Sequence, residues 1–274
     1  MHITNQISRI FGKFAKKRFP KPVQNIINSG YVKFLGLDMS EFKKPCEYDS
    51  LNALFTRALE KPRVIDTSND NFISPADSLI SQCGTLQNDT LMQIKGMEYN
   101  VDELLTYHCS SNINRVIDGE YMNFYLSPKD YHRYHAPTDC QITKLIHVPG
   151  KLYPVNFKYL KKEVGLFVQN ERVILECLKD GKVFYMIFVG ALNVGQMVFD
   201  FEPRVETNKK PDDIVVYEYD DLNIKKGECL GYFKMGSTVV MIWEKDFVNI
   251  ENLTKQKVSY GTIISTINKI ILSN

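Results

Sequence analysis

The sequence predicts an α+β protein in which N-terminal amphipathic helices precede an antiparallel β-rich body. Two observations lead to this fold class. Apolar residues recur at helical spacing over residues 1–62, whereas beyond residue 62 they form short runs bounded by turn dipeptides such as Asp-Gly. The 274 residues, 44% of them hydrophobic, suffice for a sizeable core. We therefore divide the chain into a helical region, residues 1–62, and a β-rich region, residues 63–274.

The first 37 residues form a basic arm with seven Lys or Arg side chains and no acidic residue, which leaves the remainder with a net charge of −5. Apolar residues recur three and four positions apart on both sides of a break at Pro20 and Pro22. They are Ile7, Ile10, Phe11 and Phe14 before the break, and Val23, Ile26, Ile27, Phe34 and Leu35 after it. Two short amphipathic helices are expected. The pattern fits two alternatives equally, because the apolar stripes can lie in an anionic membrane interface or pack on the protein's own body.

Local signals place further elements along the chain. A third helix is expected to begin at the N-cap Ser50 and to end before Pro62, and one or two helical turns are expected over residues 101–105. Asp118-Gly119 and Asp180-Gly181 each interrupt an alternating apolar pattern, which predicts two β-hairpins. No internal repeat or low-complexity linker divides the β-rich region.

The six cysteines never occur as a C-x-x-C pair, and no secretory signal precedes them. We expect reduced, intracellular thiols without a disulfide framework. No run of 18 apolar residues occurs either, so no bilayer-spanning helix is expected.

The stretch "YLSPKDYHRYHAP" at residues 125–137 places His132 and His135 between Pro128 and Pro137. A tight turn between the prolines can bring both imidazoles to one side. A zinc site requires a third ligand and usually has H-x-x-x-H spacing, so we predict no metal here. The alternative is a structural pair bonded to the loop backbone.

Asp77, His135 and Ser237 supply the three side-chain types of a catalytic triad. A serine hydrolase is therefore one hypothesis, although Ser237 lacks the G-x-S-x-G elbow of that class. Taken alone, Asp77 is more simply explained as a turn cap. Ser237 follows Gly236 at the mouth of an apolar, strand-like run, and a buried strand gives no reason for a Gly-Ser bond at that point.

Taken together, five segments closely resemble the phosphatidylserine decarboxylase family in order and spacing. They are "SPAD" at 74–77, "SPKDYHRYHAP" at 127–137, "LFVQNERV" at 166–173, "VGALNVG" at 189–195 and "KKGECLGYFKMGSTVV" at 225–240. Weaker similarity in "LNALFTR" at 51–57 and "IKGMEYNVDELL" at 94–105 extends the resemblance over most of the chain beyond the arm. The sequence departs from the family at Met235 and Ser78, where Leu and Gly are common.

The resemblance implies a pyruvoyl cofactor that the chain makes from Ser237 by cleaving its own Gly236-Ser237 bond. The products would be a β chain, residues 1–236, and an α chain, residues 237–274, which remain associated. In this scheme His135 takes the serine proton and Asp77 orients and stabilises the imidazolium. His132 would hold the substrate carboxylate or deliver the proton.

The implied reaction is decarboxylation of phosphatidylserine to phosphatidylethanolamine, with the pyruvoyl ketone forming a Schiff base and acting as electron sink. The expected partners are the phospholipid substrate and an anionic membrane surface, with the protein peripheral to the cytoplasmic face of the cell membrane. A homodimer is compatible with this assignment, and no nucleic-acid partner is expected.

Two other classes compete with this assignment. A pyruvoyl-dependent decarboxylase of a soluble amino acid would leave the basic arm without a purpose related to its substrate. A non-enzymatic, carrier-like β-sandwich would leave Asp77, His132 and His135 unexplained.

Overall fold

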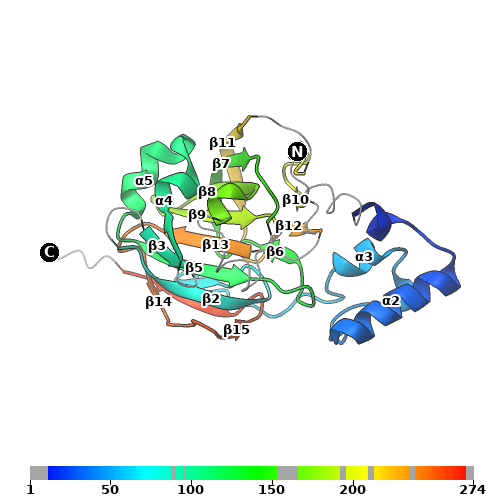
Figure 1. Cartoon of the computed structure of the whole chain (residues 1–274). Helices are drawn as coiled ribbons and strands as arrows, with labels where there is room; N and C mark the ends of the chain where they lie inside the picture. The colour runs from blue at the N-terminus through cyan, green and yellow to red at the C-terminus, as the bar shows by residue number, and fades with distance from the viewer. Residues whose placement is uncertain are drawn as a thin grey trace.

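The computed structural model describes residues 12–87, 91–94, 97–153, 166–191, 196–208, 213–234 and 238–269. A helical region beside a β-rich body makes up the molecule (Figure 1). The helical region contains α2 (Lys21–Leu35), the 3₁₀ turn η1 (Pro45–Glu47) and α3 (Leu51–Phe55). The predicted α+β class is therefore confirmed.

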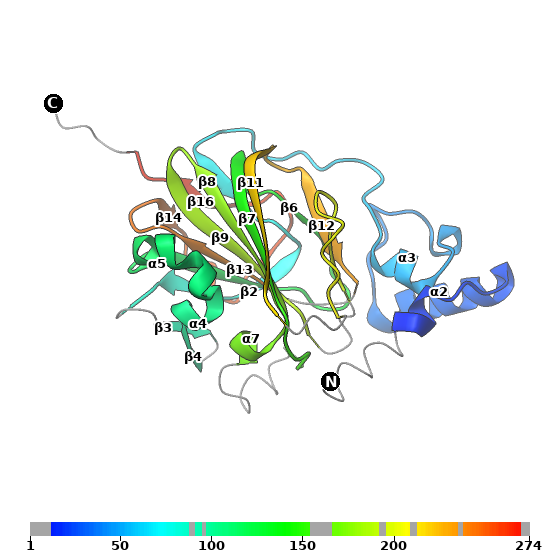
Figure 2. The ribbon, with the colours of Figure 1, turned by 90° about the horizontal axis from the view of Figure 1, so that it is seen from above.

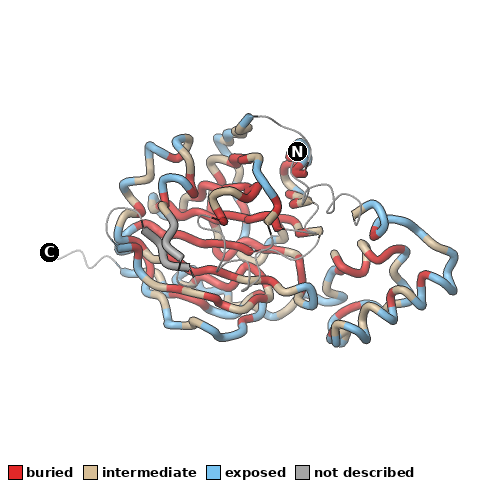
Figure 3. Tube along the Cα trace, in the orientation of Figure 1, coloured by how far each residue is buried: buried red, intermediate tan, exposed pale blue. Residues whose placement is uncertain are grey.

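An eight-stranded antiparallel sheet in the order β11-β7-β8-β9-β13-β5-β2-β15 forms the centre of the body. Its strands are β2 (Ser78–Thr85), β5 (Glu120–Tyr125), β7 (Cys140–Val148), β8 (Arg172–Lys179), β9 (Lys182–Val189), β11 (Val215–Ile224), β13 (Thr238–Trp243) and β15 (Lys257–Val258). All six residues of β13 are buried, which explains why its sequence is a nearly continuous apolar run rather than an alternating one. Figure 3 shows this burial along the central strands.

Three smaller sheets complete the body. The first has the order β10 (Met197–Phe199), β12 (Cys229–Phe233), β6 (Arg133–His135), and the second β1 (Asn71–Ile73), β16 (Ile263–Ile267), β14 (Val248–Ile250). The third pairs β3 (Leu91–Ile94) with β4 (Met97–Asn100). Both ribbon views place β6 and β12 on the side of the body that faces the helical region (Figures 1 and 2).

Short helices lie at the opposite end of the body from the helical region (Figure 2). They are α4 (Val101–Leu105), η2 (Tyr107–Cys109) and α5 (Ser110–Val116), while α7 (Leu166–Gln169) precedes β8. The Asn100 side chain caps the first turn of α4, and the predicted helical turn over residues 101–105 is confirmed.

Aromatic packing joins the sheet that contains β6 to the central sheet. The Tyr134 ring lies 4.4 Å from that of Phe188 on β9 and 4.9 Å from that of Phe233 on β12, measured between centroids. The Tyr134 hydroxyl also donates to the Val198 carbonyl on β10 at 2.6 Å. Since Tyr134 stands between the two histidines of interest, this packing fixes the strand that carries them.

One of the two predicted hairpins is confirmed and the other is wrong. Asp180 and Gly181 join β8 to β9 with φ of 51° and 76°, as a two-residue hairpin turn requires. Asp118 also has a positive φ, of 57°, but it joins helix α5 to strand β5. A Cβ at Gly119 would clash with the Trp243 carbonyl oxygen. The glycine therefore allows two segments that are distant in sequence to pack closely, and it does not form a hairpin turn.

The third predicted helix begins where expected but is shorter. The Ser50 hydroxyl accepts from the Ala53 amide, as an N-cap does, yet α3 ends at Phe55. Beyond it, Arg57 donates to the Lys129 carbonyl at 3.0 Å. The Glu60 amide donates to the Glu41 carbonyl at 2.9 Å, so a tertiary backbone hydrogen bond is present where the sequence pattern predicted a helical one.

The second arm helix is confirmed as α2, and residues 12–16 are also helical, whereas Ile7, Ile10 and Phe11 lie outside the described residues. Ile27 packs on the cluster of Ala15, Leu51 and Leu54. Val23, Ile26 and Phe34, by contrast, are 45%, 74% and 87% exposed. The helix thus has one apolar side packed and another open to solvent. Among the described residues, no helix combines the length and the apolarity that crossing a bilayer requires.

Candidate active site

Strand β6 carries His135, and His132 directly precedes it, alongside the strand that leads to the predicted cleavage bond. β6 and β12 pair antiparallel, with His135 opposite Cys229. The Phe233 amide donates to the His132 carbonyl at 2.9 Å. The backbone at His132 is therefore bonded to the chain three residues before Gly236.

Gly236 and Ser237 themselves lie outside the described residues, but the chain on either side of them is well anchored. The Lys234 amide donates to the Gln196 carbonyl at 2.8 Å. Thr238, the first residue of β13, lies opposite Tyr125 of β5 and Val189 of β9. Both flanks of the predicted cleavage bond are thus held by backbone hydrogen bonding to other segments.

The His135 imidazole is buried, and both of its ring nitrogens have partners. Nδ1 lies 2.9 Å from the Gly227 carbonyl oxygen and Nε2 lies 3.1 Å from the Tyr131 hydroxyl, while the ring stacks on Tyr260 at 3.7 Å. Since a carbonyl only accepts, we assign the proton to Nδ1 and the lone pair to Nε2. Burial lowers the pKa of His135 to about 4, although the nearby Asp77 carboxylate acts to raise it. At neutral pH the ring is therefore uncharged, as a general base must be.

The Asp77 carboxylate is held by groups other than His135 in the described contacts. Arg63 binds it through two hydrogen bonds, Nη1 to Oδ1 at 2.5 Å and Nη2 to Oδ2 at 2.9 Å, and the Tyr260 amide donates to Oδ1 at 2.7 Å. Arg63 binds Glu41 of the helical region in the same fork-like way, at 2.9 and 2.6 Å. Asp77 thus acts on His135 here through its charge, and its predicted triad role remains a prediction.

His132 is completely buried and stacks on Phe55 with 4.0 Å between ring centroids. Burial, together with the positive charge of Arg57, lowers the pKa of His132 to about 3, and a weak interaction with the Asp130 backbone opposes this. Neither ring nitrogen has a hydrogen-bond partner of normal geometry. In the described ranges, no group of three or more His, Cys, Asp or Glu side chains could hold a metal ion.

Sequence analysis missed four groups that surround the predicted residues: Arg63, Tyr131, Tyr260 and the Gly227 carbonyl. Tyr131 and Gly227 lie within quoted motifs, and Gly227 has a φ of 81°, which favours glycine. Tyr260 reaches the site from 125 residues beyond His135 in the sequence, and nothing local marks it or Arg63.

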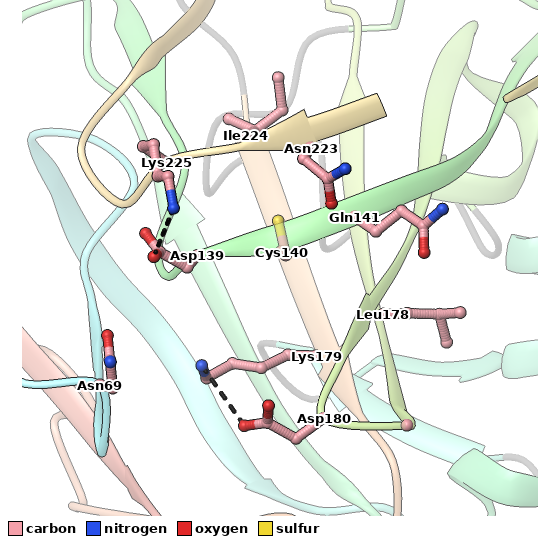
Figure 4. Close-up of a pocket in the computed structure, with 11 residues that line it drawn as sticks. Asn69, Asp139, Cys140, Gln141, Leu178, Lys179, Asp180, Asn223, Ile224 and Lys225 are labelled. Atoms are coloured by element: carbon pink, nitrogen blue, oxygen red, sulfur yellow. Dashed lines mark hydrogen bonds and ion pairs between the residues drawn. The ribbon is translucent and has the colours of Figure 1, made fainter. Parts of the chain in front are cut away.

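A surface pocket of about 580 Å³ lies where β7 begins and β8 and β11 end (Figure 4). Its cations are already paired, Lys225 with Asp139 at 3.3 Å and Lys179 with Asp180 at 3.5 Å. The remaining lining residues are Asn69, Cys140, Gln141, Leu178, Gly181, Asn223 and Ile224. No predicted site residue lines this pocket, so we do not assign the active site to it.

A buried, uncharged imidazole within the field of a carboxylate is typical of an enzyme that moves protons during its reaction. The pairing of β6 with β12 and the five sequence motifs that resemble one enzyme family narrow the class of enzyme further. The chain belongs to the phosphatidylserine decarboxylase family, whose model matches residues 51–266.

Individual relatives agree with this assignment. The phosphatidylserine decarboxylase proenzyme of Campylobacter jejuni is 44% identical over 270 residues, covering 97% of this chain and all of the relative. The Helicobacter pylori proenzyme is also 44% identical, over 96% of this chain and 97% of its own length. The Acinetobacter baumannii proenzyme is 35% identical, over 92% of this chain and 87% of its own length. The predicted resemblance is confirmed.

The two histidines predict a loss of stability in mild acid. Their pKa values in the folded protein, about 3 and about 4, lie below the ordinary value of about 6.5 that they regain on unfolding. Below pH 6.5 the unfolded chain therefore binds more protons, so the free energy of unfolding falls as the pH drops toward 4. Each histidine contributes up to about 1.4 kcal/mol per pH unit.

Urea unfolding of the wild type and of His132→Phe between pH 7 and pH 4.5 measures this effect. Phe at position 132 keeps an aromatic contact with Phe55 but cannot titrate. We expect a shallower pH dependence for the variant, and parallel curves for the two proteins would contradict the assignment for His132.

Proposed function

We propose that this protein converts phosphatidylserine to phosphatidylethanolamine with a pyruvoyl group made from its own Ser237. The observation that carries the proposal is the membership of the chain in the phosphatidylserine decarboxylase family over residues 51–266. The neutral imidazole of His135, on the strand paired with β12, supports it from the structure. The names of the relatives favour this function over decarboxylation of a soluble amino acid.

Self-cleavage begins at Ser237, whose hydroxyl is one residue beyond the Gly236 carbonyl and can attack it through a five-membered ring. Nε2 of His135 takes the serine proton, the peptide bond becomes an ester, and the Asp77 charge stabilises the imidazolium. β-Elimination then releases the chain ending at Gly236. The dehydroalanine left at position 237 hydrolyses to a pyruvoyl group and ammonia.

Tyr131 and Gly227 prepare His135 for this step. The Gly227 carbonyl fixes the ring orientation and the tautomer, which is the part that a triad aspartate usually plays. The Tyr131 hydroxyl occupies the Nε2 lone pair, and it must yield that position to the serine hydroxyl.

The residues near the cleavage bond fit a pyruvoyl group, because His132 offers a buried imidazole with both ring nitrogens unpartnered. When present, the pyruvoyl carbonyl supplies an electron sink for loss of carbon dioxide. The uncharged His132 can donate an N–H hydrogen bond to the substrate carboxylate. Delivery of a proton to the product carbon would require that His132 first be protonated, which its lowered pKa disfavours. Its stacking on Phe55 excludes water from one ring face.

The two cleaved chains would remain associated. Strand β13 comes from the shorter chain, and it lies between β9 and β5 of the longer chain in the central sheet. β15 pairs with β2, and β16 pairs with β1. The shorter chain is thus bonded to the longer one on several strands.

The membrane surface is the proposed site of substrate capture. Val23, Ile26 and Phe34 present apolar side chains to solvent from α2, within an arm that carries seven cations and no acid. Such a helix inserts its apolar side chains among lipids while the cations attract anionic headgroups. We assign the protein to the cytoplasmic face of the membrane.

The first prediction is that the mature protein consists of two chains, residues 1–236 and 237–274. Intact-mass analysis should find the 38-residue chain with a blocked N-terminus, and Ser237→Ala should remain whole. A single 274-residue species with full decarboxylase activity would exclude the pyruvoyl mechanism.

The second prediction concerns the general base. His135→Ala should slow self-cleavage by about 10²- to 10⁴-fold, because Ser237 loses its proton acceptor, and Asp77→Asn should also slow it. His132→Ala should still cleave but decarboxylate poorly. Time courses on denaturing gels, together with release of carbon dioxide, separate these steps, and cleavage of His135→Ala at the wild-type rate would reject its role.

The third prediction concerns the arm. A double variant, Ile26→Ser with Phe34→Ser, should sediment less with anionic vesicles and lose activity on bilayer substrate more than on detergent-dispersed substrate. Its melting temperature should change little, because both side chains are exposed. Val64→Ser is a matched control, since Val64 is equally open to solvent but lies outside α2.

Deleting residues 1–18 should act in the same direction, and added salt should weaken the electrostatic part of binding. If both the double variant and the truncated protein sediment with anionic vesicles as well as the wild type does, the arm does not contribute to membrane binding.

A further inference from the structure

A group of buried polar atoms without partners lies where the helical region meets the body. They belong to four side chains: the hydroxyls of Tyr31 and Tyr48, Nε and Nη1 of Arg57, and both ring nitrogens of His132. Arg57 is 2% exposed and His132 is completely buried. Native proteins leave few buried polar groups unsatisfied, so six such atoms on four neighbouring side chains require an explanation.

Electrostatic effects and shared packing indicate that the four side chains are neighbours. The Arg57 charge lowers the pKa of His132, and it opposes the rise that burial causes in the pKa values of Tyr31 and Tyr48. Nη2 of Arg57 donates to the Asp130 carbonyl at 3.3 Å, the same backbone group that weakly interacts with His132. The two tyrosines also pack together on the cluster around Leu51 and Leu54.

Packing within the protein compensates the Arg57 charge only in part: burial lowers the pKa of Arg57, and the charges of Asp77 and Asp130 oppose this without reversing it. Its guanidinium lies over the Phe42 ring at 4.5 Å, and its hydrogen bonds go to two carbonyls, those of Lys129 and Asp130. The Asp130 carboxylate accepts instead from Ser127, at 2.6 and 2.7 Å. No carboxylate among the described residues forms a direct ion pair with Arg57, and a buried charge without such a partner is unfavourable.

We propose that Arg57, Tyr31 and Tyr48 form an anion site for the phosphodiester of the substrate headgroup. This inference rests on the proposed function and adds a substrate-binding site to it. The unpartnered Nε and Nη1 of the guanidinium and two phenolic hydroxyls provide donors that phosphate oxygens accept.

The phosphodiester suits this site better than the substrate carboxylate does. The carboxylate loses its negative charge when carbon dioxide forms. A guanidinium bound to it would therefore stabilise the ground state more than the transition state and would raise the barrier to decarboxylation. The phosphodiester keeps its charge from substrate to product. In a serine phosphodiester only Cα, Cβ and an oxygen separate the carboxyl carbon from phosphorus, which matches the position of Arg57 beside the uncharged His132.

The position of the site also agrees with delivery from a membrane. Tyr31 lies on α2, the helix whose Ile26 and Phe34 are open to solvent. One helix would therefore contact the lipid with one side and contribute to headgroup binding with another.

Soluble probes separate the two anions of the substrate in the mature, cleaved protein. Glycerophosphoethanolamine carries the phosphodiester without the carboxylate, serine carries the carboxylate without phosphate, and ethanolamine carries neither. Calorimetric titration should show that glycerophosphoethanolamine binds more tightly than ethanolamine, and that Arg57→Met weakens its binding by about ten-fold or more.

Tyr48→Phe and Tyr31→Phe provide a second test should Arg57→Met fold poorly, since each removes one buried hydroxyl without a hydrogen-bond partner of normal geometry. The Tyr48 hydroxyl interacts only weakly with the Lys43 backbone. Each variant should leave the melting temperature unchanged, weaken glycerophosphoethanolamine binding and raise KM without lowering kcat in proportion. Arg115→Met, on α5 at the far end of the body, is the matched arginine control and should change neither glycerophosphoethanolamine binding nor KM, although it removes an ion pair with Glu244.

Three results would overturn the site. They are equal glycerophosphoethanolamine affinity in Arg57→Met and wild type, loss of serine binding alone in Arg57→Met, or inorganic phosphate that binds as tightly as glycerophosphoethanolamine on the same residues. Self-cleavage of each variant, followed by intact mass, reports separately on the pyruvoyl mechanism. A wild-type protein that never cleaves would refute the proposed function, whereas a cleaved wild type with unaltered probe binding in the variants would refute only this site.

Discussion

The antiparallel pairing of β6 with β12 is the constraint on which the rest of the site depends. It places His135 opposite Cys229 and bonds the His132 carbonyl to the Phe233 amide, three residues before Gly236. The turn that precedes β12 then brings the Gly227 carbonyl to Nδ1 of His135. One strand pair therefore sets the position of both histidines, the tautomer of one of them and the approach of the chain to the predicted cleavage bond.

The fold could be predicted where local signals decide it, and not where a distant contact does. Asp180-Gly181 forms a hairpin between two strands that pair with each other, whereas the same dipeptide at 118–119 follows a helix and passes close to the Trp243 backbone. The helix that begins at Ser50 stops early, and beyond it the Glu60 amide donates to the Glu41 carbonyl of another segment rather than to its own helix. Such contacts leave no periodicity in the local sequence.

The site shows the same division between local and distant information. His132 and His135 lie in one short motif, and family resemblance supplied their predicted roles and that of Asp77. Arg63 and Tyr260 reach Asp77 from other segments, so neither could be assigned from its own neighbours in sequence. The unpaired nitrogens of His132 likewise appear only after folding, since burial is a property of the packed chain.

Charges around His135 explain why it stays neutral beside a carboxylate. Burial is the largest influence and lowers its pKa; the Gly227 carbonyl and the Asp77 charge act to raise it, while Arg133 and Arg63 act to lower it. Arg63 lies directly on Asp77, so the two opposite charges largely cancel at the imidazole, and burial decides the outcome. Because Arg63 also binds Glu41 of the helical region, the partner that offsets the Asp77 charge is fixed by the part of the molecule that carries the exposed apolar side chains of α2.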